Sequence, residues 1–282
     1  MTDIRGIILG LGFDELIVTD AYPFGLGDGS LLIAIWVYEA ATCDATDEAV
    51  IHPYYPASQR AYLAAREVSR LTGLQLRNDI PLKPVLAKLD RFCRGLNTLS
   101  YLEEYGSRFH IQTFMSGKRL EPTDSIQHGN VTRICSGCGR CVEACPTGAI
   151  RKEGFDRKRC LREWMLSGRV APAEIRKQNG NRLIGCDVCE SVCPMNAGGV
   201  SKATVYPLRE LLRGQFFDLS EIIGKNLAVP NRILIQCCAI AGSLARADLI
   251  PELEALLQHP SERVREASCL ALHEIKCLAK ED

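Results

Sequence analysis

The structure at the centre of this chain follows from one cysteine-rich stretch, Cys135-Ser-Gly-Cys138-Gly-Arg-Cys141-Val-Glu-Ala-Cys145-Pro146. Its cysteines follow the pattern C-x-x-C-x-x-C-x-x-x-C-P. A second stretch, Cys186-Asp-Val-Cys189-Glu-Ser-Val-Cys193-Pro194, has the same pattern with one cysteine fewer. Cys160 lies between the two stretches and can supply the missing member. Eight of the 14 cysteines in the chain therefore belong to one ordered set.

The spacing of these cysteines is typical of bacterial ferredoxins, where three closely spaced thiolates hold one [4Fe–4S] cluster and the fourth binds a second cluster. Zinc sites also use C-x-x-C pairs, but they do not usually show a C-x-x-C-x-x-C run with Cys-Pro ends. We therefore interpret the set as ligands of two [4Fe–4S] clusters, with zinc as the alternative. The crossover rule assigns Cys135, Cys138, Cys141 and Cys193 to cluster 1, and Cys145, Cys160, Cys186 and Cys189 to cluster 2.

The charge distribution agrees with clusters in this segment. The chain has no net charge, but residues 116–182 carry 14 basic and seven acidic side chains, a net charge of +7. Each cluster with four thiolates has a net charge of about −2. We expect this charge to be stabilised by nearby basic side chains, namely Arg133, Arg140, Lys158, Arg159 and Arg182. The alternative interpretation is a nucleic-acid-binding patch.

The composition excludes several other classes of protein. Apolar residues make up 46% of the 282 residues and charged residues 24%, which is ordinary for a globular protein and excludes disorder and low complexity. The longest apolar stretch, 31–38, is too short to span a bilayer. The N-terminus has no basic segment of a signal peptide, so we expect a cytoplasmic protein. The six cysteines outside the set, at 43, 93, 237, 238, 269 and 277, are interpreted as bystanders.

Hydrophobic patterns divide the chain into three segments. Residues 1–118 mix predicted strands at 16–19, 31–38, 99–102 and 109–114 with predicted helices at 3–10, 57–72 and 82–93, which indicates an α/β domain. The glycines between 25 and 29 precede the strand at 31–38 and are predicted to form a turn.

The other two segments are a two-[4Fe–4S] ferredoxin-type domain at 119–205 and a helical domain at 206–282. The helical domain has predicted helices at 231–244, 249–257 and 261–275, which resemble HEAT repeats. The predicted fold class is thus α+β multidomain: an α/β N-terminal domain, a bacterial ferredoxin-like domain with two clusters and C-terminal HEAT-like helices.

Together these features resemble the epoxyqueuosine reductase family, the cobalamin-dependent iron–sulfur enzymes of tRNA queuosine synthesis. The eight-cysteine pattern matches that family residue by residue, and the stretch 181–187 resembles its G-N-R-x-x-G-C-D. Weaker matches precede the clusters: Gly12-Phe-Asp-Glu, Asn97-Thr-Leu99 and Tyr105-Gly-Ser107. The chain resembles a shortened or divergent member, because the stretch between Phe24 and Leu31 lacks a helical segment that walls the family's cobalamin pocket.

This resemblance implies a function. An external one-electron donor, such as flavodoxin or ferredoxin, would reduce the clusters, and these would pass electrons to cobalamin for the reductive deoxygenation of epoxyqueuosine in tRNA. The resemblance implies Asn97, Tyr105 and Ser107 as residues of the cobalamin pocket. The family's general acid is an Asp three residues before a Pro-Val pair; this position holds Pro81 here, so Asp79 is the nearest candidate.

Two alternatives stay open. One is a two-cluster electron-transfer protein whose N-terminal domain has lost cobalamin. The other is a partner-binding protein in which the clusters have only a structural role. None of the three interpretations involves a membrane.

The ligand assignment predicts the metal content of the protein. Anaerobically purified protein should contain about eight irons per chain, because two four-iron clusters are expected. The variant Cys160→Ala should lose only one cluster. Iron and sulfide analysis measures both, and a value near four irons in the unchanged protein, or zinc in place of iron, contradicts the assignment.

Overall fold

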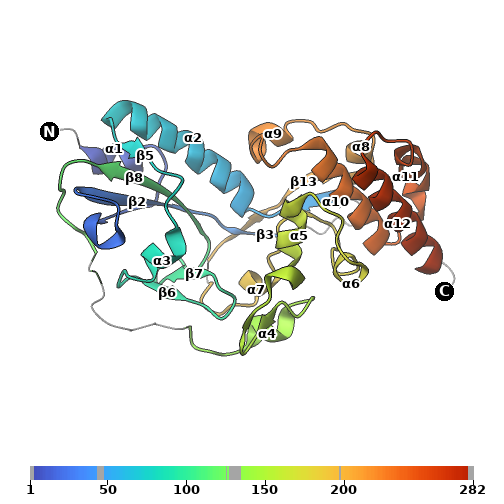
Figure 1. Cartoon of the computed structure of the whole chain (residues 1–282), viewed down its shortest axis with the longest axis horizontal. Coiled ribbons are helices and arrows are strands. Elements are labelled where there is room, and N and C mark those ends of the chain that lie inside the picture. The colour runs from blue at the N-terminus through green and yellow to red at the C-terminus, as the bar shows by residue number, and fades with distance from the viewer. Residues whose placement is uncertain (1–2, 43–47, 125, 127–134, 197, 279–282) are drawn as a thin grey trace. The chain divides into compact units, whose positions relative to one another are not determined.

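The computed structural model describes residues 3–42, 48–124, 126, 135–196 and 198–278. The chain forms two compact units, each built from separated segments (Figure 1). Unit 1 comprises Met1–Ala40, Pro56–Arg140 and Glu190–Gly199, and unit 2 comprises Ala41–Tyr55, Cys141–Cys189 and Val200–Asp282. These units cut across the three segments expected from the sequence, since their boundaries fall within the cysteine-rich part. The division at 118 and 205 stays a prediction.

Unit 1 is built on an antiparallel sheet with the strand order β1-β2-β8-β5. Its strands are β1 (Glu15–Asp20), β2 (Ser30–Val37), β5 (Gln75–Leu76) and β8 (Phe109–Ser116). The mixture of strands and helices confirms the predicted composition, but the sheet is not the parallel one of an α/β domain. The glycine-containing turn between β1 and β2 is confirmed, and it is short enough to force antiparallel pairing.

The central strand β2 contributes side chains to two hydrophobic cores. Leu31, Ile33 and Ile35 belong to one core, and Leu32 and Ala34 belong to the other. Successive side chains of a strand point to opposite faces. A strand that is covered on both faces therefore has a continuous apolar sequence. Burying each of the four leucine and isoleucine side chains contributes about 1.5–3 kcal/mol.

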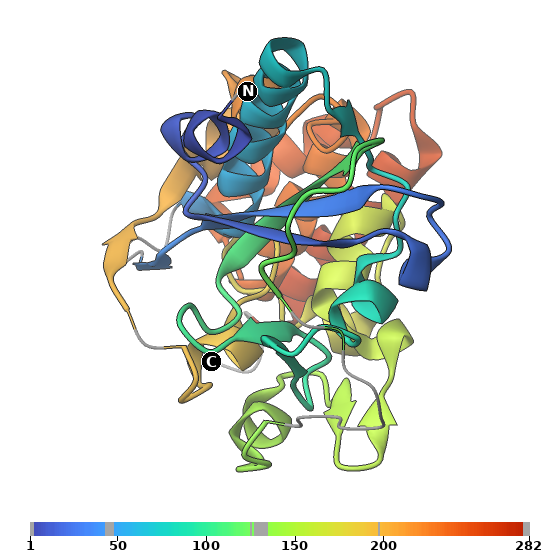
Figure 2. The ribbon, with the colours of Figure 1, turned by 90° about the vertical axis from the view of Figure 1, so that its left-hand side faces the viewer.

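Helices and a hairpin cover the two faces of this sheet (Figure 2). One face packs against α1 (Ile4–Gly10) and α2 (Tyr54–Thr72), through residues such as Ile8 and Ala65. The other face packs against α3 (Leu82–Leu86) and the pair β6 (Phe92–Arg94) and β7 (Ser100–Leu102). A 3-10 turn, η1 (Tyr22–Phe24), follows β1.

The predicted helix at 82–93 is wrong in its second half. The helix α3 ends at Leu86, and the chain returns as β6, which pairs antiparallel with β7. Phe92 lies opposite Leu102 in this pair, and both side chains are buried. The cross-strand pairing and the burial of Phe92 therefore outweigh the helical spacing of Val85, Leu86 and Leu89.

Unit 2 combines small sheets with helices. The strand β4 (Glu48–Ile51) lies between β11 (Arg182–Ile184), which is parallel to it, and β13 (Thr204–Pro207), which is antiparallel. Two further pairs are β9 (Ile150–Arg151) with β10 (Gly154–Phe155) and β3 (Ala40–Thr42) with β12 (Val200–Lys202). The short helices are α4 (Arg140–Ala144), η2 (Arg157–Arg159), α5 (Leu161–Ser167), α6 (Ala173–Arg176), α7 (Val188–Ser191), α8 (Leu208–Leu212), α9 (Leu219–Ile222) and η3 (Ala247–Leu249). The first residue of α4 and the last two residues of α7 belong to unit 1.

The C-terminal helices of unit 2 lie where the sequence predicts them. They are α10 (Pro230–Ser243), α11 (Ile250–Leu256) and α12 (Glu262–Leu278). Pro230 suits the first position of α10, because a helix leaves that N–H unpaired. Cys237 and Cys238 are buried in α10, as expected of bystanders, whereas Cys269 and Cys277 are exposed on α12. The likeness of these helices to HEAT repeats stays a prediction.

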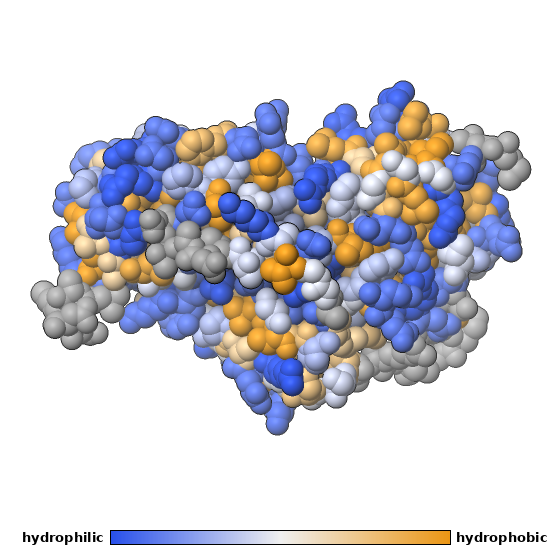
Figure 3. Space-filling view, turned by 180° about the vertical axis from the view of Figure 1, so that it is seen from behind, coloured by the Kyte–Doolittle hydropathy of each residue, from blue (hydrophilic) through white to orange (hydrophobic). Residues whose placement is uncertain are grey.

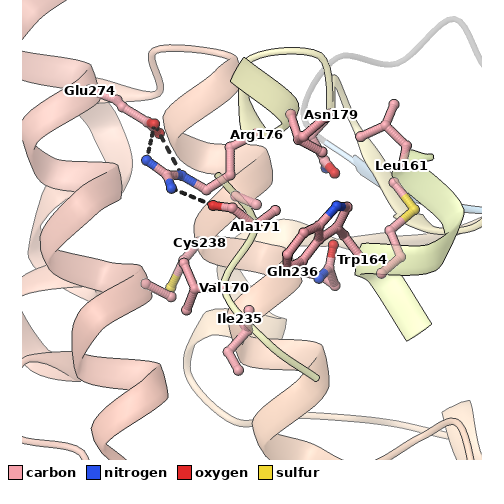
Figure 4. Close-up of a pocket in the computed structure, with 14 residues that line it drawn as sticks. Leu161, Trp164, Val170, Ala171, Arg176, Asn179, Ile235, Gln236, Cys238 and Glu274 are labelled. Carbon is pink, nitrogen blue, oxygen red and sulfur yellow. Dashed lines mark hydrogen bonds and ion pairs between the residues drawn. The ribbon is translucent and has the colours of Figure 1, made fainter. Parts of the chain in front are cut away.

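A buried ion pair joins two of the helices of unit 2 beside a pocket (Figure 4). Arg176 of α6 donates two hydrogen bonds to Oε1 of Glu274 on α12, at 2.6 and 3.1 Å, and a third to the carbonyl of Ala171 at 2.6 Å. Both charged side chains are about nine-tenths buried. The pair therefore compensates two charges that are largely shielded from water.

Within the described residues, none of the helices combines the length and the apolar character needed to cross a membrane. On the face seen in Figure 3, hydrophilic side chains are interspersed with smaller hydrophobic areas.

Removing one partner of the buried pair should destabilise the protein strongly. Glu274→Ala should lower the free energy of unfolding by about 3–5 kcal/mol, because Arg176 would keep a buried charge without its partner. The matched control is Glu163→Ala, which breaks a more exposed pair with Arg157 and should cost at most about 1 kcal/mol. Urea unfolding measures both values, and equal costs would contradict the stated role of burial.

Candidate metal centre

The eight cysteines of the set are free thiols, and they are distributed over both units. Cys135, Cys138 and Cys193 belong to unit 1, and the five others belong to unit 2. All four cysteines assigned to cluster 2 are therefore in unit 2. The described residues do not include three or more His, Cys, Asp or Glu side chains placed to hold one metal ion. The assignment of each thiol to a cluster stays a prediction.

Short helices and turns position the cysteines of unit 2. Cys141 lies in α4, and a tight turn follows Cys145, whose carbonyl accepts a hydrogen bond from Gly148 N–H at 3.1 Å. Cys160 lies between η2 and α5, and Cys189 lies in α7. Short helical pieces separated by turns thus carry the cysteines of unit 2.

Backbone N–H groups surround the sulfur of Cys145. The N–H of Ala149 lies 3.2 Å from this sulfur. Burial alone would raise the pKa of Cys145, but hydrogen bonds from the backbone of Ile150, Thr147 and Ala149 outweigh it and lower the pKa below its usual value. N–H groups directed at sulfur also stabilise the negative charge of an iron–sulfur cluster. The surroundings of this one sulfur thus suit a cluster ligand.

Cys186 has the opposite environment. Burial raises its pKa to about 11, and the opposing effects of the Val188 backbone and the Arg182 charge are smaller. The metal-free thiol is therefore protonated at neutral pH. It becomes a thiolate ligand only when a metal replaces its proton.

The basic side chains expected near the clusters have varied partners. Arg159 donates to the carbonyl of Thr147 at 2.6 Å, in the turn that follows Cys145. Arg182 pairs with Asp187 at 3.5 Å, next to Cys186. Arg140 begins α4 and Lys158 lies in η2, whereas Arg133 lies outside the described residues.

One basic residue near the cysteines was missed by the sequence reasoning. Arg162, two residues after Cys160, lies over the rings of Tyr54 and Tyr55, 5.1 and 5.8 Å from their centroids. It also donates a hydrogen bond of 3.0 Å to the Tyr55 hydroxyl. These tyrosines are more than 100 residues away in sequence, so no local pattern could indicate the contact.

Residues of unit 1 surround the last cysteine of the set. The Tyr101 hydroxyl donates a hydrogen bond to the Cys193 sulfur at 3.4 Å. The Asn97 side-chain N–H donates to the Tyr101 hydroxyl at 2.8 Å. No pattern in the sequence indicates the contact between Tyr101 and Cys193.

Ser107 contacts the loop that carries Cys193, whereas Tyr105 packs against a hydrophobic core of unit 1. The backbone N–H and the hydroxyl of Ser107 contact the Asn196 side-chain oxygen at 2.7 and 3.2 Å, just after Cys193-Pro194. Tyr105 is half-buried against the core that contains Phe92. Burial, followed by the charges of Glu15 and Asp14, raises the pKa of Tyr105.

A buried carboxylate adds a further contact to this part of unit 1. Glu190 accepts a hydrogen bond of 2.9 Å from the Tyr38 hydroxyl and lies 3.4 Å from the Arg108 Nε. The Asn196 side-chain N–H donates to the Glu190 carbonyl at 2.8 Å. The loop from 190 to 196 is thus held by several polar contacts within unit 1.

The candidate acid Asp79 lies at the surface. Its side chain is 69% exposed and accepts two hydrogen bonds of 2.7 Å from the Arg77 guanidinium. These bonds are the main reason why the pKa of Asp79 is lowered to about 2. Asp79 is therefore ionised at neutral pH and holds no proton to donate.

Comparison with known proteins supports the cluster interpretation. Residues 134–196 match the family model of a 4Fe-4S double cluster binding domain. The chain is 35% identical to an epoxyqueuosine reductase of Bacillus subtilis over 103 residues, which are 36% of this chain and 25% of that protein. It is 33% identical to the enzyme of Vibrio cholerae over 136 residues, 46% of this chain and 35% of that protein. The chain thus matches about a quarter to a third of the length of these relatives.

Solved structures of epoxyqueuosine reductases share the fold of this chain. An epoxyqueuosine reductase from Streptococcus thermophilus superposes with a TM-score of 0.74 over 97% of this chain and 89% of that one, at 17% identity. An epoxyqueuosine reductase with an epoxyqueuosine-modified tRNA-Tyr stem loop superposes with a TM-score of 0.71 over 95% of this chain and 88% of that one, at 19% identity. In its double-cluster segment this chain is similar to the epoxyqueuosine reductases, and it shares the fold of their solved structures.

Proposed function

We propose that this chain is an iron–sulfur oxidoreductase of the epoxyqueuosine reductase type. In this proposal two [4Fe–4S] clusters would supply electrons, and a cobalamin would supply the reducing metal centre, for the reductive deoxygenation of epoxyqueuosine in tRNA or for a related reduction. The observation that carries the proposal is a double-cluster segment set within a fold that matches these enzymes over 95% or more of the chain. The relative that holds a modified tRNA stem loop supports tRNA as the substrate class.

The cysteines have the role of electron relay in this proposal. Cys145, Cys160, Cys186 and Cys189 would hold one cluster, and Cys135, Cys138, Cys141 and Cys193 would hold the other. The N–H groups around Cys145 and the nearby Arg159 would favour the reduced, more negative state of the first of these clusters. An external one-electron donor such as flavodoxin or ferredoxin would supply the electrons one at a time.

Cobalamin would supply a metal centre that is reducing enough to attack the substrate carbon–oxygen bond. The residues implied for its pocket are Asn97, Tyr105 and Ser107. The side chains of Asn97 and Ser107 are engaged in hydrogen bonds with Tyr101 and Asn196, so they offer a cobalamin fewer free polar groups than the resemblance implies. These contacts would have to open before Asn97 and Ser107 could hold a cobalamin.

A second candidate function follows from the same observation. A two-cluster electron-transfer protein without cobalamin would need the cluster ligands but no pocket and no acid. The internal hydrogen bond of Asn97 favours it, because the Asn97 side chain is then less available to a cobalamin. The two candidates differ in whether the protein binds cobalamin.

Titration with hydroxocobalamin distinguishes the two functions. Anaerobically reconstituted protein should shift the cobalamin absorbance and then reduce an epoxyqueuosine-modified tRNA stem loop when a chemical reductant is supplied. The variant Cys160→Ala should lose the reduction, because one cluster of the relay is missing. The matched control Cys269→Ser changes an exposed cysteine outside the set and should keep both clusters and full activity. Intact clusters without any cobalamin shift would favour the electron-transfer protein.

The ion pair of Asp79 gives a separate prediction about the proton donor. Arg77→Gln should raise the pKa of Asp79 from about 2 toward its ordinary 3.8, because the pair is the main cause of the lowering. Carboxyl-carbon NMR measures this titration, and an unchanged pKa would contradict the cause. A carboxyl with so low a pKa is ionised throughout the neutral range, so Asp79→Asn should leave the shape of the pH–rate profile between about pH 5 and 8 unchanged.

A further inference from the structure

We propose that Tyr101 is a positioning residue for the iron–sulfur cluster bound through Cys193, and that its hydroxyl hydrogen bond to the Cys193 sulfur raises the reduction potential of that cluster. This inference rests on the proposed ligand role of Cys193. It concerns the chemistry around the ligand and is independent of cobalamin and of the substrate.

The neighbouring Asn97 fixes the direction of the Tyr101 proton. The Asn97 side-chain oxygen accepts a hydrogen bond from the Leu99 N–H at 3.2 Å, which sets the orientation of the amide. Its side-chain N–H then points at the Tyr101 hydroxyl, 2.8 Å away. An amide N–H only donates, so the hydroxyl oxygen accepts this bond and keeps its own proton for the Cys193 sulfur.

The pair lies away from water. Tyr101 is 1% exposed and Asn97 is 4% exposed. A Cβ built on Gly95 would lie 2.6 Å from the Tyr101 ring carbon Cε2 and 2.5 Å from the Asn97 side-chain oxygen, so the absence of a side chain at 95 allows both groups to occupy their positions. A hydrogen bond in such a low-dielectric place is electrostatically stronger than one in water.

The sulfur that receives the bond is held by the same unit. The Cys193 N–H donates to the Glu190 carbonyl at 3.2 Å, and Asn196 bonds both Glu190 and Ser107. The Glu190 carboxylate is in turn bonded to Tyr38. The donor and the acceptor are therefore both fixed within unit 1, and the 3.4 Å contact does not depend on a mobile side chain.

The effect on the potential follows from charge. Reduction adds an electron to a cluster that is already negative, and a hydrogen bond to a ligand sulfur stabilises the more negative state. Removing the donor should therefore make the cluster harder to reduce. Asn97 strengthens the effect indirectly, because it prevents the Tyr101 proton from turning away from the sulfur.

The direct test is Tyr101→Phe, which removes the hydroxyl and keeps the ring. In a redox titration followed by EPR, one of the two clusters should show a lower potential and the other should be unchanged. Cys193→Ala identifies the cluster concerned, because it should remove the signal of that same cluster. The matched control is Tyr206→Phe, which removes a hydroxyl bonded to Asp218 in unit 2 at 2.7 Å and should leave both potentials unchanged.

Two further measurements keep the inference falsifiable. The reduced protein should show an exchangeable proton coupled to one cluster in ENDOR spectra, and Tyr101→Phe should abolish this coupling. Asn97→Asp keeps the ring and the acceptor for Leu99, but its carboxylate attracts the Tyr101 proton, so it should also lower the potential and weaken the coupling. If Tyr101→Phe does not assemble its clusters, Asn97→Asp decides the question.

The outcomes separate this inference from the proposed function. If the unchanged protein binds no iron, the ligand role of Cys193 and the proposed function fail together. If both clusters assemble and neither variant changes a potential or the coupled proton, the inference about Tyr101 is wrong while the proposed function stands. A shifted potential in a protein that never binds cobalamin supports the inference and contradicts the reductase.

Discussion

The centre of this chain must stabilise negative charge on sulfur, and the rest of its structure depends on this requirement. A cluster held by four thiolates keeps a net negative charge, and a protein interior stabilises such a charge only with donors and cations close by. The excess of basic side chains between 116 and 182 would supply such cations. Backbone N–H groups around Cys145 and the hydroxyl of Tyr101 supply donors at two different sulfurs.

The sheet of unit 1 determines where one of these sulfurs lies. Ser107 and Arg108 immediately precede β8, which is paired along its whole length with β2. Through Asn196 and Glu190, these two residues hold the loop that carries Cys193. The residues that build the sheet therefore also help to set the geometry of this polar site.

The sequence predicts those features that depend on neighbours along the chain. The cysteine spacing, the turn between 25 and 29 and the helices after 230 are all local patterns, and the double-cluster segment was recognisable for that reason. The hairpin at Phe92 was missed, because its partner Leu102 outweighs a helical spacing. The contact of Tyr101 with Cys193 joins residues 92 positions apart, and no periodicity encodes such a pair. The Arg77–Asp79 pair is local, but only the structure shows that the two side chains turn toward each other.

The strand β2 has a consequence for how unit 1 unfolds. Because its alternate side chains belong to both hydrophobic cores, neither core is complete without it. Separating β2 from β8 exposes the two cores in the same event, so the layers on either side of the sheet have no independent stability. Unit 1 should accordingly exchange its sheet amide hydrogens as one cooperative block, with a single opening free energy shared by strands that face different helices.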